Sequence, residues 1–180
     1  PFIVSTWGRE ITDTPKQSWI MKKVVEYVLS KADAITATSG MLKKETAKYV
    51  KSGKPIYQIP FGIDTNEFIP IKNKKNNKTI CIGTVKGLEE KYGIEFLIRA
   101  FAKVKNYEDD IRLLIVGDGS LFRRLVNLSE KLGIIEKSTF TGNVPYDEVL
   151  HYLQQIDIFI VPSISESETF GVAAVEASAC

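Results

Sequence analysis

Residues 156–161 read Ile-Asp-Ile-Phe-Ile-Val, an almost uniformly apolar run that leads into Pro162-Ser163 and an Ala-rich helical pattern from Gly171 onward. A short apolar run of this kind is typical of a β-strand that is buried on both faces. Strands of this type occur in parallel sheets whose two faces are covered by helices. This segment therefore predicts an α/β fold built on a doubly wound parallel sheet.

The same alternation of apolar strands and helical patterns runs along the rest of the chain, which supports this fold class. The pattern predicts strands at 2–6, 34–38, 56–59, 79–83, 111–116 and 138–141, in addition to 156–161. It predicts helices over 15–31, 39–50, 94–104, 120–132 and 146–155, and a last one from 171. Thr14-Pro15 is a typical helix start, and Ser39 and Ser120 are the expected caps of two further helices.

Residues 71–78 interrupt this alternation with four Lys and three Asn. A phosphate-binding patch is the alternative interpretation, but runs of this kind usually stay in water as linkers. The sequence therefore predicts two Rossmann-like α/β units, residues 1–70 and 79–180, joined by a linker at 71–78.

Composition limits the classes of protein that fit. The 180 residues are 44% hydrophobic and 26% charged, with a formal net charge of +2, as in ordinary globular proteins. This balance disfavours nucleic acid as the main partner. Two cysteines, Cys81 and Cys180, can form neither a disulfide framework nor a zinc cluster, and no metal-binding pattern is present. Neither end carries a start or stop signal, so we expect an incomplete chain.

Two glutamates follow the apolar strand at 156–161. Glu168 precedes the last predicted helix and Glu176 lies within it, which places their carboxylates about 10 to 12 Å apart. That separation exceeds the ~5 to 9.5 Å of a glycosidase acid/base pair but suits the two ends of one long ligand. Gly171 would let a phosphate approach the N-terminus of the helix. The alternative is that Glu168 complements the helix dipole and Glu176 is a solvated helix residue.

Other strand ends carry glycines, and the backbone amides of such loops could hold an anion. The segment 83–93 contains three Gly and two Lys, Lys86 and Lys91, but it lacks P-loop spacing and, taken alone, is better explained as a turn than as a site. Gly117-Asp118-Gly119 is a tight strand-to-helix turn with a backbone contact to a nucleotide as its alternative role. The segment 142–145 ends a strand at the same edge. His151, the only histidine, is expected to be structural or solvated.

The order of these motifs resembles retaining, nucleotide-sugar-dependent glycosyltransferases of the GT-B fold, of the group 1 (family 4) type. The resemblance covers essentially the whole chain. Besides the Glu168–Glu176 spacing with Phe170-Gly171, it rests on five segments: 60–64, 83–93, 115–119, 140–144 and 160–163.

This resemblance implies a set of site residues. Glu168 would be the catalytic residue that contacts the donor sugar, and Glu176 would hold the ribose hydroxyls. Thr84 stands where relatives have an Arg, so Lys86 is the expected substitute, and Lys91 matches the family Lys on the diphosphate. The other residues implied to bind the donor substrate are Gly83, Gly119, Asn143, Val144, Phe170, Gly171 and Val172.

The resemblance also implies the reaction and its setting. The expected enzyme is a metal-independent hexosyltransferase with no cofactor, whose donor is a nucleoside-diphosphate sugar and whose acceptor is a glycan or lipid-linked molecule. Trp7 stands where relatives often have a His, so no catalytic base is implied. The expected location is cytoplasmic. Attachment to the inner face of the cell membrane, through contacts of the missing N-terminal part, is left open. We expect the isolated fragment to be poorly active.

Two alternatives remain at this point. A nucleotide-sugar epimerase of the same fold would need acid/base groups that these residues do not supply. A nucleotide-binding module without catalysis would need only the donor-side loops.

Overall fold

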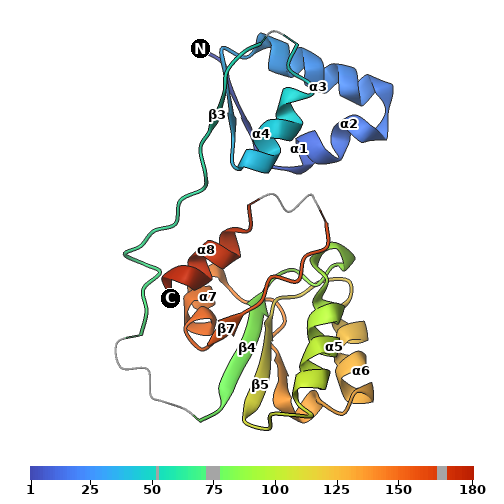
Figure 1. Ribbon diagram of the computed structural model, residues 1–180, viewed down its shortest axis with the longest axis vertical. Coiled ribbons are helices and arrows are strands. Elements are labelled where there is room, and N and C mark those ends of the chain that lie inside the picture. Colours follow the sequence, from blue (N-terminus) through green and yellow to red (C-terminus); the bar gives the residue numbers. More distant parts are fainter. Residues whose placement is uncertain (52, 72–77, 166–169) are drawn as a thin grey trace. The chain divides into compact units, whose positions relative to one another are not determined.

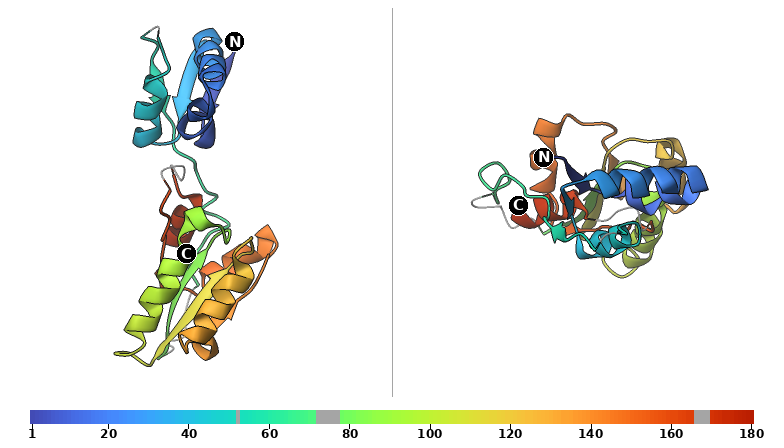
Figure 2. Two further views of the ribbon diagram at one scale, coloured as in Figure 1. Left: turned by 90° about the vertical axis from the view of Figure 1, so that its right-hand side faces the viewer. Right: turned by 90° about the horizontal axis from the view of Figure 1, so that it is seen from above.

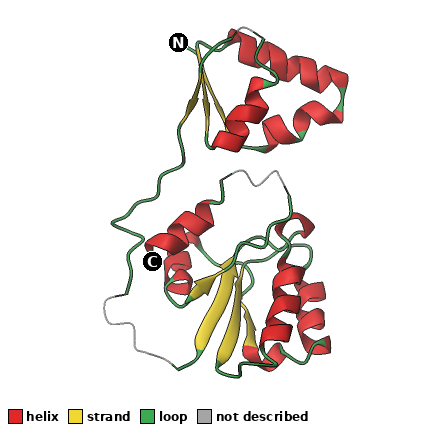
Figure 3. Cartoon of the chain, in the orientation of Figure 1, coloured by secondary structure: helices red, strands yellow, loops and turns green. Residues whose placement is uncertain are grey.

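The protein is described by a computed structural model that covers residues 1–51, 53–71, 78–165 and 170–180. These residues form two compact units (Figure 1). Unit 1 comprises Pro1–Gly62 and Ser165–Gly171, and unit 2 comprises Ile63–Ile164 and Val172–Cys180. Each unit contains one sheet whose paired strands are all parallel, together with helices (Figure 3). The predicted α/β class is therefore confirmed.

Unit 1 holds a three-stranded sheet in the order β1-β2-β3. The strands are β1 (Ile3–Thr6), β2 (Ala34–Ala37) and β3 (Ile56–Gln58), and the helices are α1 (Arg9–Thr12), α2 (Thr14–Gln17), α3 (Trp19–Lys31) and α4 (Gly40–Ala47). Its core joins strand residues to helices: Ile35 and Ile56 pack with Leu29 and Leu42, which are almost completely buried.

The helix predicted over 15–31 is wrong in one respect, because the chain breaks at Ser18. Ser18 is extended, with φ −163° and ψ 162°, and its side chain accepts a hydrogen bond from the Met21 amide at 3.2 Å. A serine in this conformation is a helix N-cap, since its hydroxyl replaces a missing intrahelical partner. The cap ends α2 and starts α3.

Unit 2 holds a four-stranded sheet in the order β6-β5-β4-β7. The strands are β4 (Ile80–Val85), β5 (Ile111–Val116), β6 (Ser138–Phe140) and β7 (Ile158–Phe159). Its α-helices are α5 (Ile94–Val104), α6 (Phe122–Lys131), α7 (Tyr146–Leu153) and α8 (Val172–Ala179), with short 3₁₀ turns η1 (Glu90–Tyr92) and η2 (Ile135–Lys137). Because all strands run parallel, their carboxyl ends meet at one edge.

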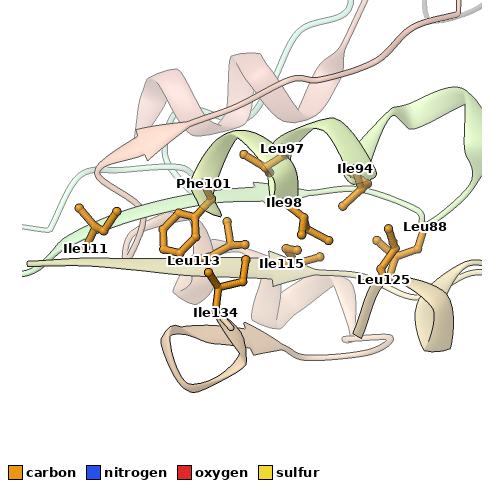
Figure 4. Close-up of a cluster of buried hydrophobic side chains, with 10 residues drawn as sticks. All are labelled: Leu88, Ile94, Leu97, Ile98, Phe101, Ile111, Leu113, Ile115, Leu125 and Ile134. Carbon is orange, nitrogen blue, oxygen red and sulfur yellow. The ribbon is translucent and has the colours of Figure 1, made fainter. Parts of the chain in front are cut away.

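Both faces of this sheet are covered. Leu113 and Ile115 of β5 point toward α5 and α6, which lie side by side (Figures 2 and 4). The intervening residues Leu114 and Val116 belong to a second cluster that contains Tyr152 of α7. Alternate residues of one strand thus enter two cores, which confirms the predicted doubly wound sheet.

Several predicted boundaries differ from the structure. Ser120 does not cap α6; Leu121 occupies the cap position, and the Ser120 hydroxyl binds the Glu89 carboxylate instead. The strand predicted over 156–161 is shorter, because Ile156 ends the turn after α7 and donates its amide to Leu153. Helix α7 ends at Leu153 rather than at residue 155.

The change from one unit to the next falls at Ile63 rather than at the expected residue 70. Phe68 explains this position: its side chain is 3% exposed and packs with Val149 and Leu153 of unit 2. Burial of a phenylalanine is worth roughly 1.5–3 kcal/mol, which fixes the segment to this unit. Of the expected linker, residues 72–77 lie outside the described residues.

None of the helices in the described residues is long and apolar enough to span a membrane.

Gly83 lies in the middle of β4, where a methyl group would not fit. A Cβ there would lie 2.7 Å from the Leu114 carbonyl oxygen and 2.8 Å from the Ile156 side chain. We expect Gly83→Ala to destabilise unit 2 by about 1–3 kcal/mol through overpacking. Urea unfolding followed by circular dichroism measures this. Tryptophan fluorescence would not report on unit 2, because both tryptophans, Trp7 and Trp19, lie in unit 1.

Gly62→Ala is the matched control, because no atom lies within 4 Å of its Cβ position. Its unfolding midpoint should stay close to that of the parent protein. An equal midpoint for Gly83→Ala would contradict the packing argument.

Candidate functional site

The loops that follow the four strands of unit 2 are joined by backbone hydrogen bonds. The Leu88 amide donates to Asp118 at 2.9 Å, which links the loops after β4 and β5. The Gly117 amide donates to Gly142 at 3.1 Å, which adds the loop after β6, and the Ile164 amide donates to Lys91 at 3.1 Å, which adds the loop after β7. The strand ends that the sequence indicated therefore meet at one edge, where open α/β folds bind ligands.

Three glycines permit these loops to approach one another. A Cβ on Gly117, with φ 134°, would overlap the backbone of Lys86, and one on Gly119 would lie 2.6 Å from the Leu88 carbonyl oxygen. Gly93, with φ 64°, would overlap the carbonyl of Pro162. Close backbone packing therefore accounts for each of these glycines, including Gly119, which the family resemblance implies to bind the donor substrate.

Glu89 joins the first two loops through its side chain. Its carboxylate accepts hydrogen bonds from the Ser120 amide at 2.9 Å and from the Ser120 hydroxyl at 2.5 Å. The Ser120 hydroxyl, then its amide and the charge of Lys91 hold the pKa of Glu89 below its ordinary value, against a smaller opposing effect of burial. Sequence reasoning missed this pair, because the two residues lie 31 positions apart with no motif to connect them.

Lys86 and Lys91, the two cations predicted for the diphosphate, lie against one aromatic ring. The Lys86 and Lys91 Nζ atoms are 4.9 Å and 4.7 Å from the centre of the Tyr92 ring. A tyrosine face attracts ammonium groups through its ring quadrupole. The structure therefore brings these two lysines together on the loop after β4, and the clamp on a diphosphate that the resemblance implies for them stays a prediction.

Other predicted contacts lie in different surroundings. Gly83 is buried inside β4, and packing accounts for it without a ligand. Thr84, at the position of the family Arg, is only 1% exposed. Asn143 is exposed in the loop after β6, and the neighbouring Val144 packs partly into unit 2.

Glu176 is buried in α8, with 6% of its surface exposed. The Tyr146 hydroxyl donates a hydrogen bond to its Oε1 at 3.1 Å. The alternative that Glu176 is a solvated helix residue is therefore wrong. Buried carboxylates in proteins are usually paired or functional. Sequence reasoning also missed the bond between Tyr146 and Glu176, since the helical pattern predicts Tyr146 only as the first residue of a helix.

Glu168, the predicted catalytic residue, lies outside the described residues. Phe170 packs edge-on against Phe61 with ring centres 5.5 Å apart, and Phe61 packs in the same way against Trp7 at 5.0 Å. Gly171 has φ 74°, a conformation that favours glycine, and Val172 begins α8. Trp7, at the position where relatives often carry a His, is thus one end of an aromatic row in unit 1.

His151 is exposed on α7, with its ring centre 5.8 Å from that of Tyr152, as expected for a structural or solvated residue. Among the residues that the structure describes, no group of three or more His, Cys, Asp or Glu is placed to hold a metal ion.

The parallel sheets and their helices define an α/β protein with a doubly wound sheet in unit 2, and comparisons with known proteins identify its family. Residues 65–180 match the family model described as "Glycosyl transferases group 1". The chain belongs to this family.

Curated relatives agree with this assignment. The chain is 25% identical over 198 residues to a GDP-mannose-dependent α-(1-6)-phosphatidylinositol monomannoside mannosyltransferase of Mycolicibacterium smegmatis, covering 99% of this chain and 50% of the relative. It is 28% identical over 167 residues to an N-acetyl-α-D-glucosaminyl L-malate synthase of Bacillus anthracis, covering 89% and 42%. The chain thus spans about half the length of these relatives.

Solved structures confirm the GT-B fold. Sucrose-phosphate synthase of Thermosynechococcus elongatus matches with a TM-score of 0.79 at 22% identity, over 99% of this chain and 48% of that one. Anabaena HepE in complex with UDP matches with a TM-score of 0.80 at 19% identity, over 98% and 50%.

The Glu89–Ser120 pair predicts a measurable change in acidity. Ser120→Ala removes the hydroxyl donor, so we expect the pKa of Glu89 to rise toward its ordinary value. In the parent protein the lowered pKa stabilises the fold above the unfolded-state pKa, and this contribution is lost as pH falls through the folded-state pKa. Carbon-detected NMR titration of the Glu89 carboxyl measures the shift.

Ser178→Ala is the control, since the Ser178 hydroxyl donates its hydrogen bond within α8, to the Ala174 carbonyl oxygen. An unchanged Glu89 titration in Ser120→Ala would show that the pair does not hold the two loops together in solution.

Proposed function

We propose that the whole protein is a retaining, metal-independent glycosyltransferase that transfers a hexose or N-acetylhexosamine from a nucleoside diphosphate to a glycan or lipid-linked acceptor. The observation that carries the proposal is that unit 2 contains both a buried carboxylate, Glu176, and two lysines, Lys86 and Lys91, on the loop after β4. Glu176 suits a ribose, and Lys86 with Lys91 suits a diphosphate.

The diphosphate end requires positive charge without a metal. Lys86 and Lys91 supply two ammonium groups on the loop that precedes α5, and Gly93 at the start of that helix leaves its first amides without a side-chain cap. The positive end of a helix adds to the attraction for phosphate. These groups would stabilise the charge that develops on the leaving nucleoside diphosphate.

Transfer with retention follows from a substitution on one face of the sugar. The bond between the anomeric carbon and the diphosphate oxygen breaks, and the acceptor oxygen bonds to the anomeric carbon from the same side. The proton of the acceptor hydroxyl passes to the departing phosphate oxygen, so no histidine is required at Trp7. Glu168 would hold the donor sugar in this step, as the family pattern implies.

The curated relatives support a lipid-linked or small hydroxylated acceptor. The mycobacterial relative is named for a phosphatidylinositol monomannoside, and the Bacillus relative for L-malate. We propose an acceptor of this general kind, a cytoplasmic location, and a role in glycolipid or polysaccharide synthesis.

Calorimetric titration with UDP, GDP and their sugars, in buffer without divalent cations, tests the donor assignment. We expect Lys86→Ala and Lys91→Ala each to weaken nucleotide binding about 5- to 20-fold at low salt, by losing one charge-assisted contact, and to reduce its salt dependence. Lys103→Ala, an exposed lysine of α5, is the matched control for loss of one charge.

Unchanged binding by both lysine variants would refute the diphosphate assignment. A product assay with the parent protein and a lipid or glycan acceptor then separates transfer from the two alternatives. An epimerised sugar, or binding with no product, would replace the transferase proposal by the epimerase or the binding module.

A further inference from the structure

Glu176 of α8 is held by a tyrosine from a different helix. The hydrogen bond from the Tyr146 hydroxyl reaches Oε1 at 3.1 Å and joins residues 30 positions apart. Tyr146 is the first residue of α7, after Pro145 with φ −59°, a conformation well suited to a helix start. The bond therefore fixes the carboxylate of α8 to the beginning of α7.

Tyr146 is itself supported from one side. Its ring packs edge-on against Phe68, with ring centres 6.3 Å apart. Phe68 is 3% exposed and anchored between Val149 and Leu153 of α7. The tyrosine ring remains 62% exposed, so its position depends on Phe68 at one edge and on Glu176 at the hydroxyl.

The bond leaves most of the carboxylate free to accept. An ionised carboxylate offers about four lone-pair sites, and Tyr146 occupies one of them on Oε1. Two adjacent hydroxyls of a ribose can bind the remaining sites only if the plane of the carboxylate is fixed. A neutral phenol suits this task, because it orients the carboxylate without cancelling its charge.

We propose that Tyr146 is a positioning residue that orients Glu176 toward the ribose hydroxyls of the donor nucleotide. This inference rests on the proposed function. Desolvation, the charge of Glu176 and its hydrogen bond, together with the charge of Glu67, raise the pKa of Tyr146 above its ordinary value. The phenol thus keeps its proton at neutral pH and remains a donor.

Calorimetry with two ligands separates orientation from general damage to the fold. The probes are UDP or GDP, whichever binds the parent protein, and the 2′,3′-dideoxy form of the same nucleotide. Tyr146→Phe should weaken binding of the ribose nucleotide about 3- to 10-fold, the range for the loss of one ordinary hydrogen bond, and leave dideoxynucleotide binding unchanged. In Glu176→Ala, adding Tyr146→Phe should have no further effect.

Tyr107→Phe is the matched control, because Tyr107 is 92% exposed and loses the same hydroxyl. A circular dichroism spectrum and urea midpoint for each variant establish that the fold is retained. Tyr146→Leu, which also removes the ring contact with Phe68, should show the same dependence on ribose.

The outcomes distinguish this inference from the proposed function. If Glu176→Ala weakens ribose-nucleotide binding and Tyr146→Phe does not, the positioning role is refuted and the donor site stands. Equal weakening of both nucleotides by Tyr146→Phe would likewise refute it, since the role would be structural. If the parent protein binds no nucleotide, or Glu176→Ala binds as the parent does, the ribose assignment fails and the inference with it.

Discussion

The carboxyl edge of the sheet in unit 2 depends on backbone segments that approach too closely for a side chain between them. At Gly93, Gly117 and Gly119 a Cβ atom would collide with a carbonyl group of a neighbouring loop. Hydrogen bonds across the same contacts then join the ends of all four strands. The places of Lys86 and Lys91 follow from this constraint, because they lie on the loop that is held between the others. The proposed anion site is thus carried by closely packed backbone.

A second support comes from the segment that follows Gly62. It leaves unit 1 and inserts Phe68 into the cluster formed by α7 and α8. This packing places one aromatic ring beside Tyr146, whose hydroxyl reaches Glu176. The buried carboxylate is therefore maintained by packing that the segment 63–70 supplies, and not by α8 alone. Because residues 63–70 pack on unit 2, the boundary between the units lies before this segment, whereas the Lys/Asn run at 71–78 places the predicted boundary after it.

The elements with strong periodic patterns could be predicted to the residue. Helix α5 and strand β5 have the predicted bounds, because an amphipathic stripe and an unbroken apolar run are local signals. Features decided by two distant segments could not. Ser120 looked like a cap by position, but the Glu89 carboxylate is a better partner for its hydroxyl than the first turn of α6. Glycine and lysine placement at the sheet edge followed from motif order, whereas the Tyr146–Glu176 bond spans 30 positions and has no local signature. The role of Glu168 stays a prediction.

The two ends of the proposed donor site are built differently, and the difference has a physical basis. A ribose is recognised by the direction of its hydroxyls, which requires an acceptor fixed in orientation, and Glu176 of α8 has one oxygen already bonded to Tyr146 of α7. A diphosphate is recognised mainly by charge, which falls off slowly with distance and tolerates movement of the cation. Two lysines resting on the Tyr92 ring meet that need at little cost, because a cation–π contact holds an ammonium group near the ring without removing its charge. Directional recognition is thus placed in the helical core, and charge recognition on the loop.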